Sequence, residues 1–473
     1  MYTESMPALS KLKPVIISGR EVLPIVEGGK GVGASNGVTS GAFAAAGAVG
    51  TFSGVNGLIY RPDGTPEPLI YKGTTRREKH EELVASGIEA GVYHAQVAHE
   101  ASNGQGRVHI NVLWEMGGCE RVLEGVLERA KGLVHGVTCG AGMPYRLSDI
   151  AEKYNVHYHP IISSMRAFRA LWKRAYSRTK DLLGSVVYED PWLAGGHNGL
   201  SNSEDPNRPE DPYPRVRELR QFMNEVGLHE VPIIMAGGAW HLNDWEHWLD
   251  NPEIGPIAFQ FGTRPLLTNE SPIPAEWKER LMTLKKGDVF LNRFSPTGFY
   301  SSAVNNDFIE DLRARNDRQV GFAMEPEGYM SEPFLYGPRK RPHYMTPEDK
   351  ERADSWINLG YTEALKTPDD TMIFVTPPNA AEIHQDQVDC MGCLTHCRFS
   401  NWKDHDDFTT GKKADPRSFC IQKTLQDIVR GGSIENNLMF AGHNAYKFGQ
   451  DPFYSNGFVP SVRQLVDRIM TGY

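Results

Sequence analysis

The sequence predicts an α/β protein that begins with a (β/α)8 TIM barrel and continues into C-terminal insertions carrying a four-cysteine cluster loop. Two observations predict the barrel: β-like runs alternate with amphipathic helical segments, and glycine-rich loops follow several of the runs. The eight predicted strands are Val22–Val26, Gly50–Ser53, Val108–Leu113, Leu133–Thr138, His157–Ile161, Ser185–Tyr188, Pro232–Ala236 and Ile257–Gln260. A doubly wound open sheet is the alternative, because the order of elements does not show that the sheet closes.

The composition excludes several classes of protein. The 473-residue chain has a formal net charge of −9 and no long Lys/Arg run, which argues against a nucleic-acid partner. No stretch approaches the roughly 18 apolar residues of a membrane span, and Met1–Pro14 lacks the apolar core of a signal peptide. Six cysteines in so long a chain do not form a secreted disulfide scaffold. We therefore expect a soluble, cytoplasmic protein with no membrane partner.

Three regions are expected along the chain. Residues 1–320 are predicted to form the barrel, residues 321–420 an insertion with the cysteine loop, and residues 421–473 helices that pack back on the barrel. Glu325–Met345 is rich in Pro, Gly, Tyr and Arg, so it is expected to be a surface excursion. Beyond the barrel, helical patterns occur at Pro274–Leu284, Asn305–Arg315, Thr346–Leu365 and Val459–Met470, and a strand-like run at Asp288–Arg293.

Glycine-rich loops follow five of the predicted strands. Glycine lets the backbone approach a ligand closely and adopt a positive φ. Any barrel needs tight turns, but ligands gather at the carboxyl ends of barrel strands, so five such loops favour one shared ligand. The loops read G-G-K-G-V-G (Gly28–Gly33), T-C-G-A-G-M-P (Thr138–Pro144), A-G-G-H-N-G (Ala194–Gly199), A-G-G-A-W-H (Ala236–His241) and F-G-T-R (Phe261–Arg264).

Four of the six cysteines are clustered in the C-terminal half. Cys390, Cys393 and Cys397 have the spacing C-x2-C-x3-C, and Cys420 follows at the start of a predicted helix. Four thiolates in two neighbouring loops suit an iron–sulfur cluster or a closed zinc site. A zinc site would more often use two separated C-x2-C knuckles. The three-plus-one spacing therefore favours a [4Fe-4S] cluster, with zinc as the alternative.

Several motifs occur in a recognisable order along the chain. They are P-I-V-E-G-G-K-G-V-G (Pro24–Gly33), S-G-A-F-A-A-A-G-A-V-G-T (Ser40–Thr51), H-I-N-V-L (His109–Leu113), A-G-G-H-N-G, P-I-I-M-A-G-G (Pro232–Gly238) and Q-F-G-T-R-P-L-L-T-N-E-S (Gln260–Ser271). With them the chain resembles the nitronate monooxygenase family of FMN-dependent barrels, which also includes flavin enoyl-acyl-carrier-protein reductases. The resemblance extends over Pro24–Arg315 and returns in the final helices.

The resemblance implies FMN as the cofactor. In the family, the A-G-G and G-T-R turns hold the phosphate, and backbone N–H groups at such turns suit a dianion. The matching positions here are Gly237, Gly238, Gly262 and Thr263. The other cofactor contacts that the resemblance implies are Gly29, Gly31, Asn111 and Gly196.

His197 in the A-G-G-H-N-G loop matches the catalytic histidine of the family. Histidine suits a general base because its pKa lies near neutrality; a loop histidine bonded to backbone is the alternative. Lys30 departs from the methionine common in the family's first loop. It would stabilise reduced FMN, bind an acidic group of the substrate, or point to solvent. His159 and His241 fall at predicted strand ends and are expected around the catalytic residues or facing the substrate.

The cysteine loop resembles that of dienoyl-CoA-reductase-type flavin barrels and of an iron–sulfur branch of the nitronate-monooxygenase-like family that desaturates and isomerises acyl-carrier-protein substrates. We therefore predict an FMN- and [4Fe-4S]-dependent oxidoreductase that dehydrogenates, and on the family pattern also isomerises, an acyl thioester with His197 as base. A nitronate monooxygenase using O2 and a flavin enoyl or quinone reductase are the alternatives. A small-molecule or carrier-bound acyl substrate, an acyl carrier protein and a second copy of the chain are the candidate partners.

Overall fold

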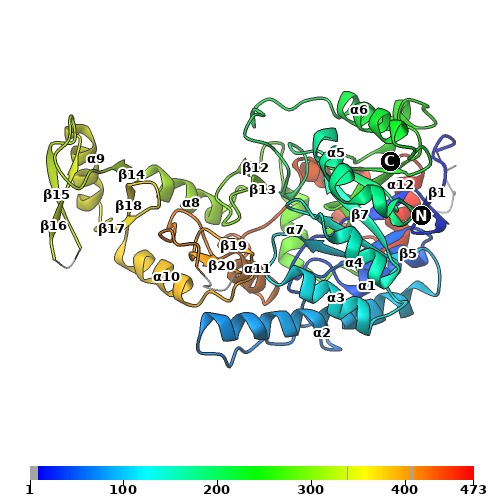
Figure 1. Cartoon of the computed structure of the whole chain (residues 1–473), viewed down its shortest axis with the longest axis horizontal. Helices are drawn as coiled ribbons and strands as arrows, with labels where there is room; N and C mark the ends of the chain where they lie inside the picture. The colour runs from blue at the N-terminus through cyan, green and yellow to red at the C-terminus, as the bar shows by residue number, and fades with distance from the viewer. Residues whose placement is uncertain (1–8, 338, 405–408) are drawn as a thin grey trace.

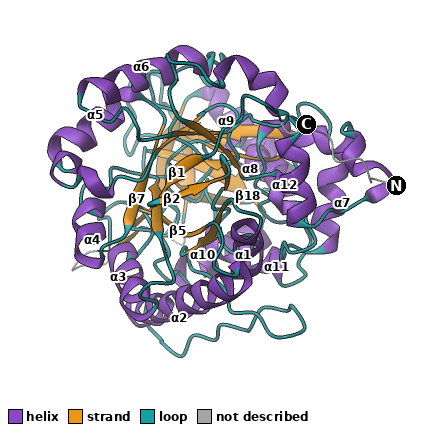
Figure 2. Ribbon diagram, turned by 90° about the vertical axis from the view of Figure 1, so that its right-hand side faces the viewer, coloured by secondary structure: helices purple, strands orange, loops and turns teal. Residues whose placement is uncertain are grey.

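The computed structural model describes residues 9–337, 339–404 and 409–473, and its centre is a closed parallel barrel ringed by helices (Figure 2). The ring order is β10-β11-β3-β4-β5-β6-β7-β8, and every neighbouring pair is parallel. The strands are β3 (Ile25–Glu27), β4 (Val49–Ser53), β5 (Arg107–Leu113), β6 (Gly136–Gly140), β7 (His157–Ile162), β8 (Val186–Glu189), β10 (Ile233–Ala236) and β11 (Ile257–Phe261). Closure confirms the predicted TIM barrel, so the open-sheet alternative was wrong.

The helices around the barrel bury one apolar face each. In α3 (Cys119–Arg129) the residues with helical spacing, Val122, Leu123, Val126 and Leu127, are all buried. The other helices of the ring are α1 (Gly37–Ala45), α2 (Arg76–Ser102), α4 (Leu147–Tyr154), α5 (Met165–Arg174), α6 (Pro212–Glu225) and α12 (Val462–Met470). Short 3-10 helices lie at η1 (Tyr176–Arg178), η2 (Lys180–Leu182), η3 (Leu242–Trp248), η4 (Arg264–Leu266), η5 (His443–Gly449) and η6 (Pro452–Gly457).

A hairpin of β1 (Val15–Ile17) and β2 (Arg20–Val22) precedes the barrel. The predicted run Val22–Val26 therefore spans two strands, β2 and β3. The hairpin turn places the Ser18 hydroxyl 2.9 Å from Nε2 of both His109 and His159, whose rings stack at 4.3 Å. His159 thus lies inside the barrel in a structural hydrogen-bond network. Its predicted position beside the catalytic residues was wrong, because it is the third residue of β7 and not a strand end.

A long insertion lies between β11 and α12. It starts with α7 (Ala275–Thr283), β12 (Val289–Asn292) and α8 (Asp307–Asp317), which agree with the predicted helices and strand, and with β13 (Ser301–Val304), which was not predicted. β13 also pairs with the two-residue strand β9 (Gly196–His197) of the barrel loops. This pairing joins the insertion to the glycine loop that carries His197.

The insertion continues into a lobe that projects away from the barrel (Figure 1). The lobe has a small apolar core of its own, which includes Phe322, Met345 and Phe374. The expected surface excursion Glu325–Met345 contains an ordered hairpin, and the predicted helix to Leu365 ends at Asn358. The elements of the lobe are β14 (Gln319–Gly321), β15 (Glu332–Tyr336), β16 (Arg341–Met345), α9 (Pro347–Asn358), β17 (Glu363–Lys366) and β18 (Thr371–Val375).

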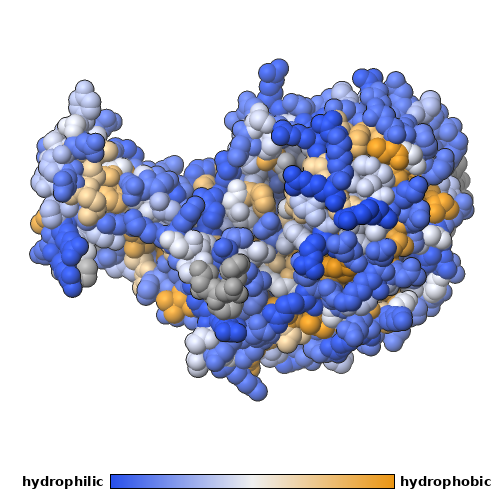
Figure 3. Space-filling view, viewed as in Figure 1, coloured by the Kyte–Doolittle hydropathy of each residue, from blue (hydrophilic) through white to orange (hydrophobic). Residues whose placement is uncertain are grey.

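The chain returns towards the barrel through the cysteine loop. The returning elements are α10 (Pro377–Val388), β19 (His396–Cys397), β20 (Trp402–Lys403) and α11 (Ile421–Val429). With α7, α8 and β13 they bury a second apolar core that also contains Val32 and Ala34 of the first barrel loop. Polar side chains dominate the visible surface, with scattered apolar patches (Figure 3). Within the described residues, no helix combines the length and apolarity that crossing a bilayer requires.

Candidate active site

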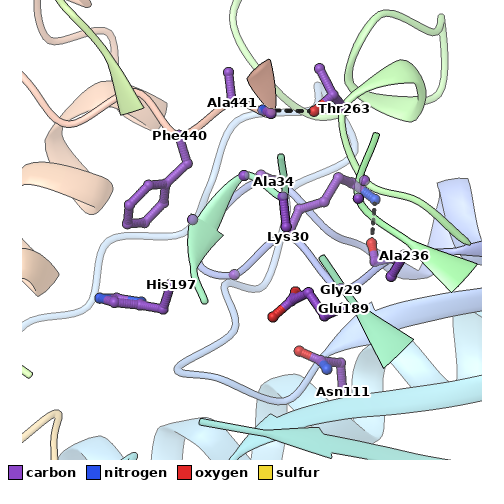
Figure 4. Close-up of a pocket in the computed structure, with 18 of the residues that line it drawn as sticks. Gly29, Lys30, Ala34, Asn111, Glu189, His197, Ala236, Thr263, Phe440 and Ala441 are labelled. Atoms are coloured by element: carbon purple, nitrogen blue, oxygen red, sulfur yellow. Dashed lines mark hydrogen bonds between the residues drawn. The ribbon is translucent and has the colours of Figure 1, made fainter. Parts of the chain in front are cut away.

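A cavity of about 230 Å³ opens at the carboxyl ends of the barrel strands (Figure 4). Its wall contains His197 and every residue that the resemblance assigned to the cofactor: Gly29, Gly31, Asn111, Gly196, Gly237, Gly238, Gly262 and Thr263. These residues come from loops up to about half the chain apart in sequence. The structure therefore brings the predicted site residues together around one space. His241, by contrast, is not among the residues that line this cavity, and its ring contacts that of Tyr473.

Glycine is required at one turn of the cavity wall, and at a second turn it leaves the backbone unobstructed. Gly237 and Gly238 have φ values of +86° and +84°, a region that residues with a Cβ rarely adopt. At the next turn, a Cβ on Gly262 would meet no atom within 4 Å, so this backbone faces open space. The Thr263 hydroxyl stands beside it. Such a set of exposed backbone groups and a hydroxyl suits an anionic group such as a phosphate.

Asn111 and Gly29 pack against each other at the floor of the cavity (Figure 4). A Cβ on Gly29 would come within 2.3 Å of the Asn111 side chain. Asn111 is almost fully buried, and its Nδ2 donates a long hydrogen bond of 3.4 Å to the carbonyl of Thr138. A buried amide has further hydrogen-bonding capacity, which a ligand in the cavity would satisfy.

His197 is held by residues of the insertion. Its Nε2 lies 2.6 Å from the Ser295 hydroxyl, which in turn lies 2.8 Å from the Thr297 hydroxyl. The Phe440 ring packs edge-on against the imidazole at 5.5 Å. Burial lowers the pKa of His197 to about 4, because the charged imidazolium loses its hydration. The histidine is therefore neutral near pH 7 and able to accept a proton.

Lys30 lies in the wall of the cavity and does not point to solvent. Its Nζ is 2.6 Å from Oε1 of the fully buried Glu27, and it donates to the carbonyl of Gly28 at 3.2 Å. The other carboxylate oxygen of Glu27 accepts a hydrogen bond from the backbone N–H of Thr51. The Lys30 ammonium therefore forms a buried ion pair with Glu27. The two opposite charges balance each other in the wall of the cavity.

Sequence reasoning missed Glu189, the last residue of β8. Its carboxyl faces the cavity near Asn111 and Gly29 (Figure 4). Burial, with a smaller contribution from Asp190, raises the pKa of Glu189 to about 8. The signal in the sequence was a glutamate directly after a predicted apolar strand. In the structure this strand ends one residue later than predicted, at Glu189 itself.

Residues of the insertion also line the cavity, and no sequence signal indicated them: Phe440, Ala441, Gly442, Asn444 and Ala445. The backbone N–H of Gly442 donates to the Thr263 hydroxyl at 3.0 Å, and Asn444 Nδ2 donates to the carbonyl of Gly238 at 2.6 Å. The insertion is therefore bonded directly to the two turns that the sequence assigned to a phosphate.

The predicted metal ligands lie next to the same cavity. Cys390, Cys393 and Cys397 are buried, Cys420 is the N-cap of α11, and Cys393 and Leu394 line the cavity. Burial and then the neighbouring thiols raise the pKa of Cys393, and burial raises those of Cys397 and Cys420 to about 11 and about 12. Across residues 9–337, 339–404 and 409–473, no group of three or more His, Cys, Asp or Glu side chains is arranged to hold a metal ion.

The cysteine loop is fixed to the barrel by backbone contacts. The N–H of Gly117 donates to the carbonyl of Cys393 at 3.0 Å, and Nδ1 of His80 lies 3.0 Å from the carbonyl of Gly392. Gly392 has φ +68°, and a Cβ there would come within 2.4 Å of Trp402. The glycine of C-M-G-C is thus required for the loop to pack between His80 and Trp402.

Comparisons with known proteins agree with this architecture. The family model described as nitronate monooxygenase matches residues 76–368. FabK from Thermotoga maritima is similar with a TM-score of 0.50 and 13% identity, over 95% of this chain and 92% of that chain. The enoyl reductase domain of MlnA from Bacillus amyloliquefaciens gives a TM-score of 0.50 and 11% identity, over 95% and 93%. Comparison with curated protein sequences gives no match.

The family match, at a closed parallel barrel with a glycine-lined cavity, identifies the class of protein as a flavin oxidoreductase. The family match spans more than half of the chain. The chain therefore belongs to the nitronate monooxygenase family, which confirms the resemblance inferred from its motifs.

Proposed function

We propose that this protein is an FMN- and [4Fe-4S]-dependent oxidoreductase that dehydrogenates an acyl thioester. The observation that carries the proposal is that Cys393 and His197 line the same cavity. A cluster held by the cysteine loop would lie next to the flavin, within reach for electron transfer. Among the functions considered, this one gives the four cysteines a role.

The cavity fits FMN on two grounds. The turns at Gly237–Gly238 and Gly262–Thr263 present backbone and a hydroxyl to the phosphate, and the Gly262 backbone is unobstructed. Asn111 has a buried amide that needs a hydrogen-bond partner, and the ring system of the flavin would supply one. When bound, FMN would supply the acceptor for a hydride from the β-carbon of the acyl chain.

His197 would remove the proton from the α-carbon of the thioester. Its Nε2 lies 2.6 Å from the Ser295 hydroxyl, so Nδ1 would be the base in the tautomer whose Nε2–H donates to Ser295. The Ser295 hydroxyl also lies within hydrogen-bond distance of the Thr297 hydroxyl, which would help to hold the imidazole in place. Loss of the α-proton and the β-hydride gives a 2-enoyl thioester.

The cysteine loop fits a metal cluster in the chemistry of its donors. Thiols that are buried together and raise one another's pKa are protonated in the absence of a cation. A bound cluster would reverse this effect and release the thiol protons. Cys420, at the N-terminus of α11, would in addition be stabilised as a thiolate by the helix dipole.

The visible absorption spectrum of anaerobically purified protein, before and after dithionite, tests the cofactor assignment. Flavin bands on a broad shoulder that the reductant bleaches, together with iron and sulfide in the sample, are expected. Flavin bands without iron would remove the cluster. Formation of enoyl thioester from a saturated acyl thioester, with an artificial electron acceptor, then tests the reaction.

Oxidation of an alkyl nitronate is the second candidate, because the matching family model is described as nitronate monooxygenase. The neutral His197 and the adjoining cavity suit an anionic nitronate equally well. Oxygen consumption with an alkyl nitronate, in protein that lacks thioester dehydrogenation, would favour this candidate.

A further inference from the structure

Glu189 has the position of a ligand-binding residue. It ends β8 at the carboxyl end of the barrel, where its carboxyl faces the cavity beside Asn111 and Gly29 (Figure 4). β5 and β8 lie far apart in the ring, separated by β6 and β7, so Glu189 and Asn111 approach the cavity floor from different sides. Two polar side chains converge there on one small space.

Three other charged or titratable groups of the cavity wall have protein partners. Lys30 pairs with Glu27, Arg264 donates to the Trp240 carbonyl and the Tyr454 hydroxyl, and His197 bonds Ser295. The remaining nitrogen of Arg264 lies 3.8 Å from a carboxylate oxygen of Asp451. Asp190, next to Glu189 in sequence, accepts hydrogen bonds from the N–H groups of Trp192 and Leu193.

The carboxyl of Glu189, by contrast, makes no hydrogen bond to any residue in the described part of the chain. Glu189 is partly buried and lines the cavity, so a ligand bound there would be able to form hydrogen bonds with its carboxyl.

A neutral carboxyl offers one donor and one acceptor side by side, whereas a carboxylate only accepts. The imide edge of a flavin ring offers the complementary pair, an N–H next to a carbonyl. Acyl thioesters and nitronates present only acceptor oxygens near their reacting atoms. The chemistry of Glu189 in its neutral form therefore matches the flavin better than either substrate.

We propose that Glu189 binds the imide edge of the flavin through its protonated carboxyl and thereby makes flavin affinity depend on pH. The inference rests on the FMN part of the proposed function and not on the thioester or the cluster. Ionisation of Glu189 removes the donor and places a negative charge against a flavin carbonyl. The pKa near 8 sets the range in which this occurs. Because binding requires the protonated form, affinity is expected to fall about tenfold between pH 7 and pH 9.

Titration of the apoprotein with FMN, followed by quenching of flavin fluorescence at pH 7 and pH 9, tests the inference. Wild type is expected to lose about tenfold in affinity at the higher pH. Glu189→Gln keeps a donor and an acceptor without titrating, so its affinity is expected to stay nearly constant. Glu189→Ala is expected to bind FMN about tenfold more weakly than wild type at pH 7.

Glu115→Gln is the matched control. Glu115 also follows a barrel strand and has a pKa raised by burial, but it is not among the residues that line the cavity. This variant is expected to keep the wild-type pH dependence, including any part that arises from FMN itself.

Three results would overturn the inference: a wild-type affinity that is equal at both pH values, the same pH dependence in Glu189→Gln and wild type, or wild-type affinity in Glu189→Ala at pH 7. The first needs no variant, so it holds even where a substitution prevents folding. No substrate takes part in the FMN titration. Failure of thioester dehydrogenation would therefore contradict the proposed reaction without affecting the inference about Glu189. Absence of FMN binding would overturn both.

Discussion

At the scale of single residues, burial sets the protonation states around the cavity. The same loss of hydration lowers the pKa of His197 and raises that of Glu189, because in each case the charged form is penalised. Both groups are thus neutral at pH 7, one able to accept a proton and the other able to donate a hydrogen bond. Neither state follows from the residue type, since free glutamate is ionised at that pH.

The shifted pKa of Glu189 predicts a pH-dependent cost in stability. Below pH 4.5 the carboxyl is protonated in the folded and unfolded states alike. Between pH 4.5 and about 8 only the unfolded state ionises, so the free energy of unfolding falls with pH and levels off above pH 8. Glu189→Gln is expected to raise stability relative to wild type by about 1–3 kcal/mol at pH 8.5 and little at pH 4.5.

Urea unfolding of the apoprotein at both pH values measures this difference. Glu279→Gln, an exposed glutamate on α7, serves as the control and is expected to change stability equally at the two pH values. An equal effect of Glu189→Gln at pH 4.5 and pH 8.5 would contradict the prediction.

The role assigned to His197 predicts a loss of turnover without loss of cofactor. His197→Ala is expected to lower kcat by about 10²- to 10⁴-fold, the usual contribution of a general base. His443→Ala is the matched control, because His443 also bonds a serine, here Ser302 of β13, and has a pKa lowered by burial, yet it is not among the cavity-lining residues. Steady-state kinetics would measure kcat of both variants, and the flavin spectrum would show how much cofactor each variant holds. An equal loss of kcat in both variants would argue for a purely structural role of His197.

At the scale of elements, the cysteine loop depends on contacts that no local pattern specifies. The loop is oriented against the strand-end loop after β5 by two kinds of contact. The carbonyls of Gly392 and Cys393 are held by hydrogen bonds, and Trp402 packs against Gly392. The spacing of the cysteines predicts that three thiols converge, but the position of the loop beside the cavity comes from these contacts.

The cluster proposal predicts a selective loss of iron. Cys393→Ala is expected to lower bound iron to near background, because a four-iron cluster needs all of its thiolates. Cys119→Ala is the control: Cys119 is also a buried free cysteine, but it lies outside the C-x2-C-x3-C loop. Iron and acid-labile sulfide analysis of both variants, with flavin content measured alongside, provides the test. Equal iron in the two variants would contradict the assignment.

At the scale of the whole molecule, the last helix completes the barrel that the first helices begin. The four buried residues of α12 join the barrel core, and α12 packs against α1 across nearly the whole length of the chain. Glu270 accepts hydrogen bonds from the backbone N–H of Val462 at the start of the helix. The long insertion is thus held between two parts of one barrel.

Loss of a buried contact in α12 is therefore expected to weaken the whole barrel. Leu465 is fully buried, so Leu465→Ala should lower the free energy of unfolding by about 2–5 kcal/mol. Arg463→Ala, two residues away on the exposed face, should change it by less than about 0.5 kcal/mol. Thermal or urea unfolding measures both; similar values would show that the helix is not part of the barrel's cooperative unit.

The amino-acid sequence by itself determined the alternation of strands and helices and the glycine turns that line the cavity, whereas closure of the barrel was seen only in the structure. Alternating strands and helices are local patterns, and the glycine turns are recognisable because few residues tolerate their backbone geometry. The C-terminal end of each strand faces the same mouth of a barrel, so the predicted turns had to meet once the sheet closed.

Only the tertiary structure decided which groups share the cavity and in what state. Glu189, Phe440 and Asn444 reach it from β8 and from the insertion, and nothing in their local sequence marks them as neighbours of Gly238. His159 was misplaced because it lies three residues before the end of β7, where its side chain points into the barrel interior and not into the mouth. The partnering of Lys30 with Glu27 and the shifts in pKa depend on burial, which arises from contacts between distant segments and not from any single stretch of sequence.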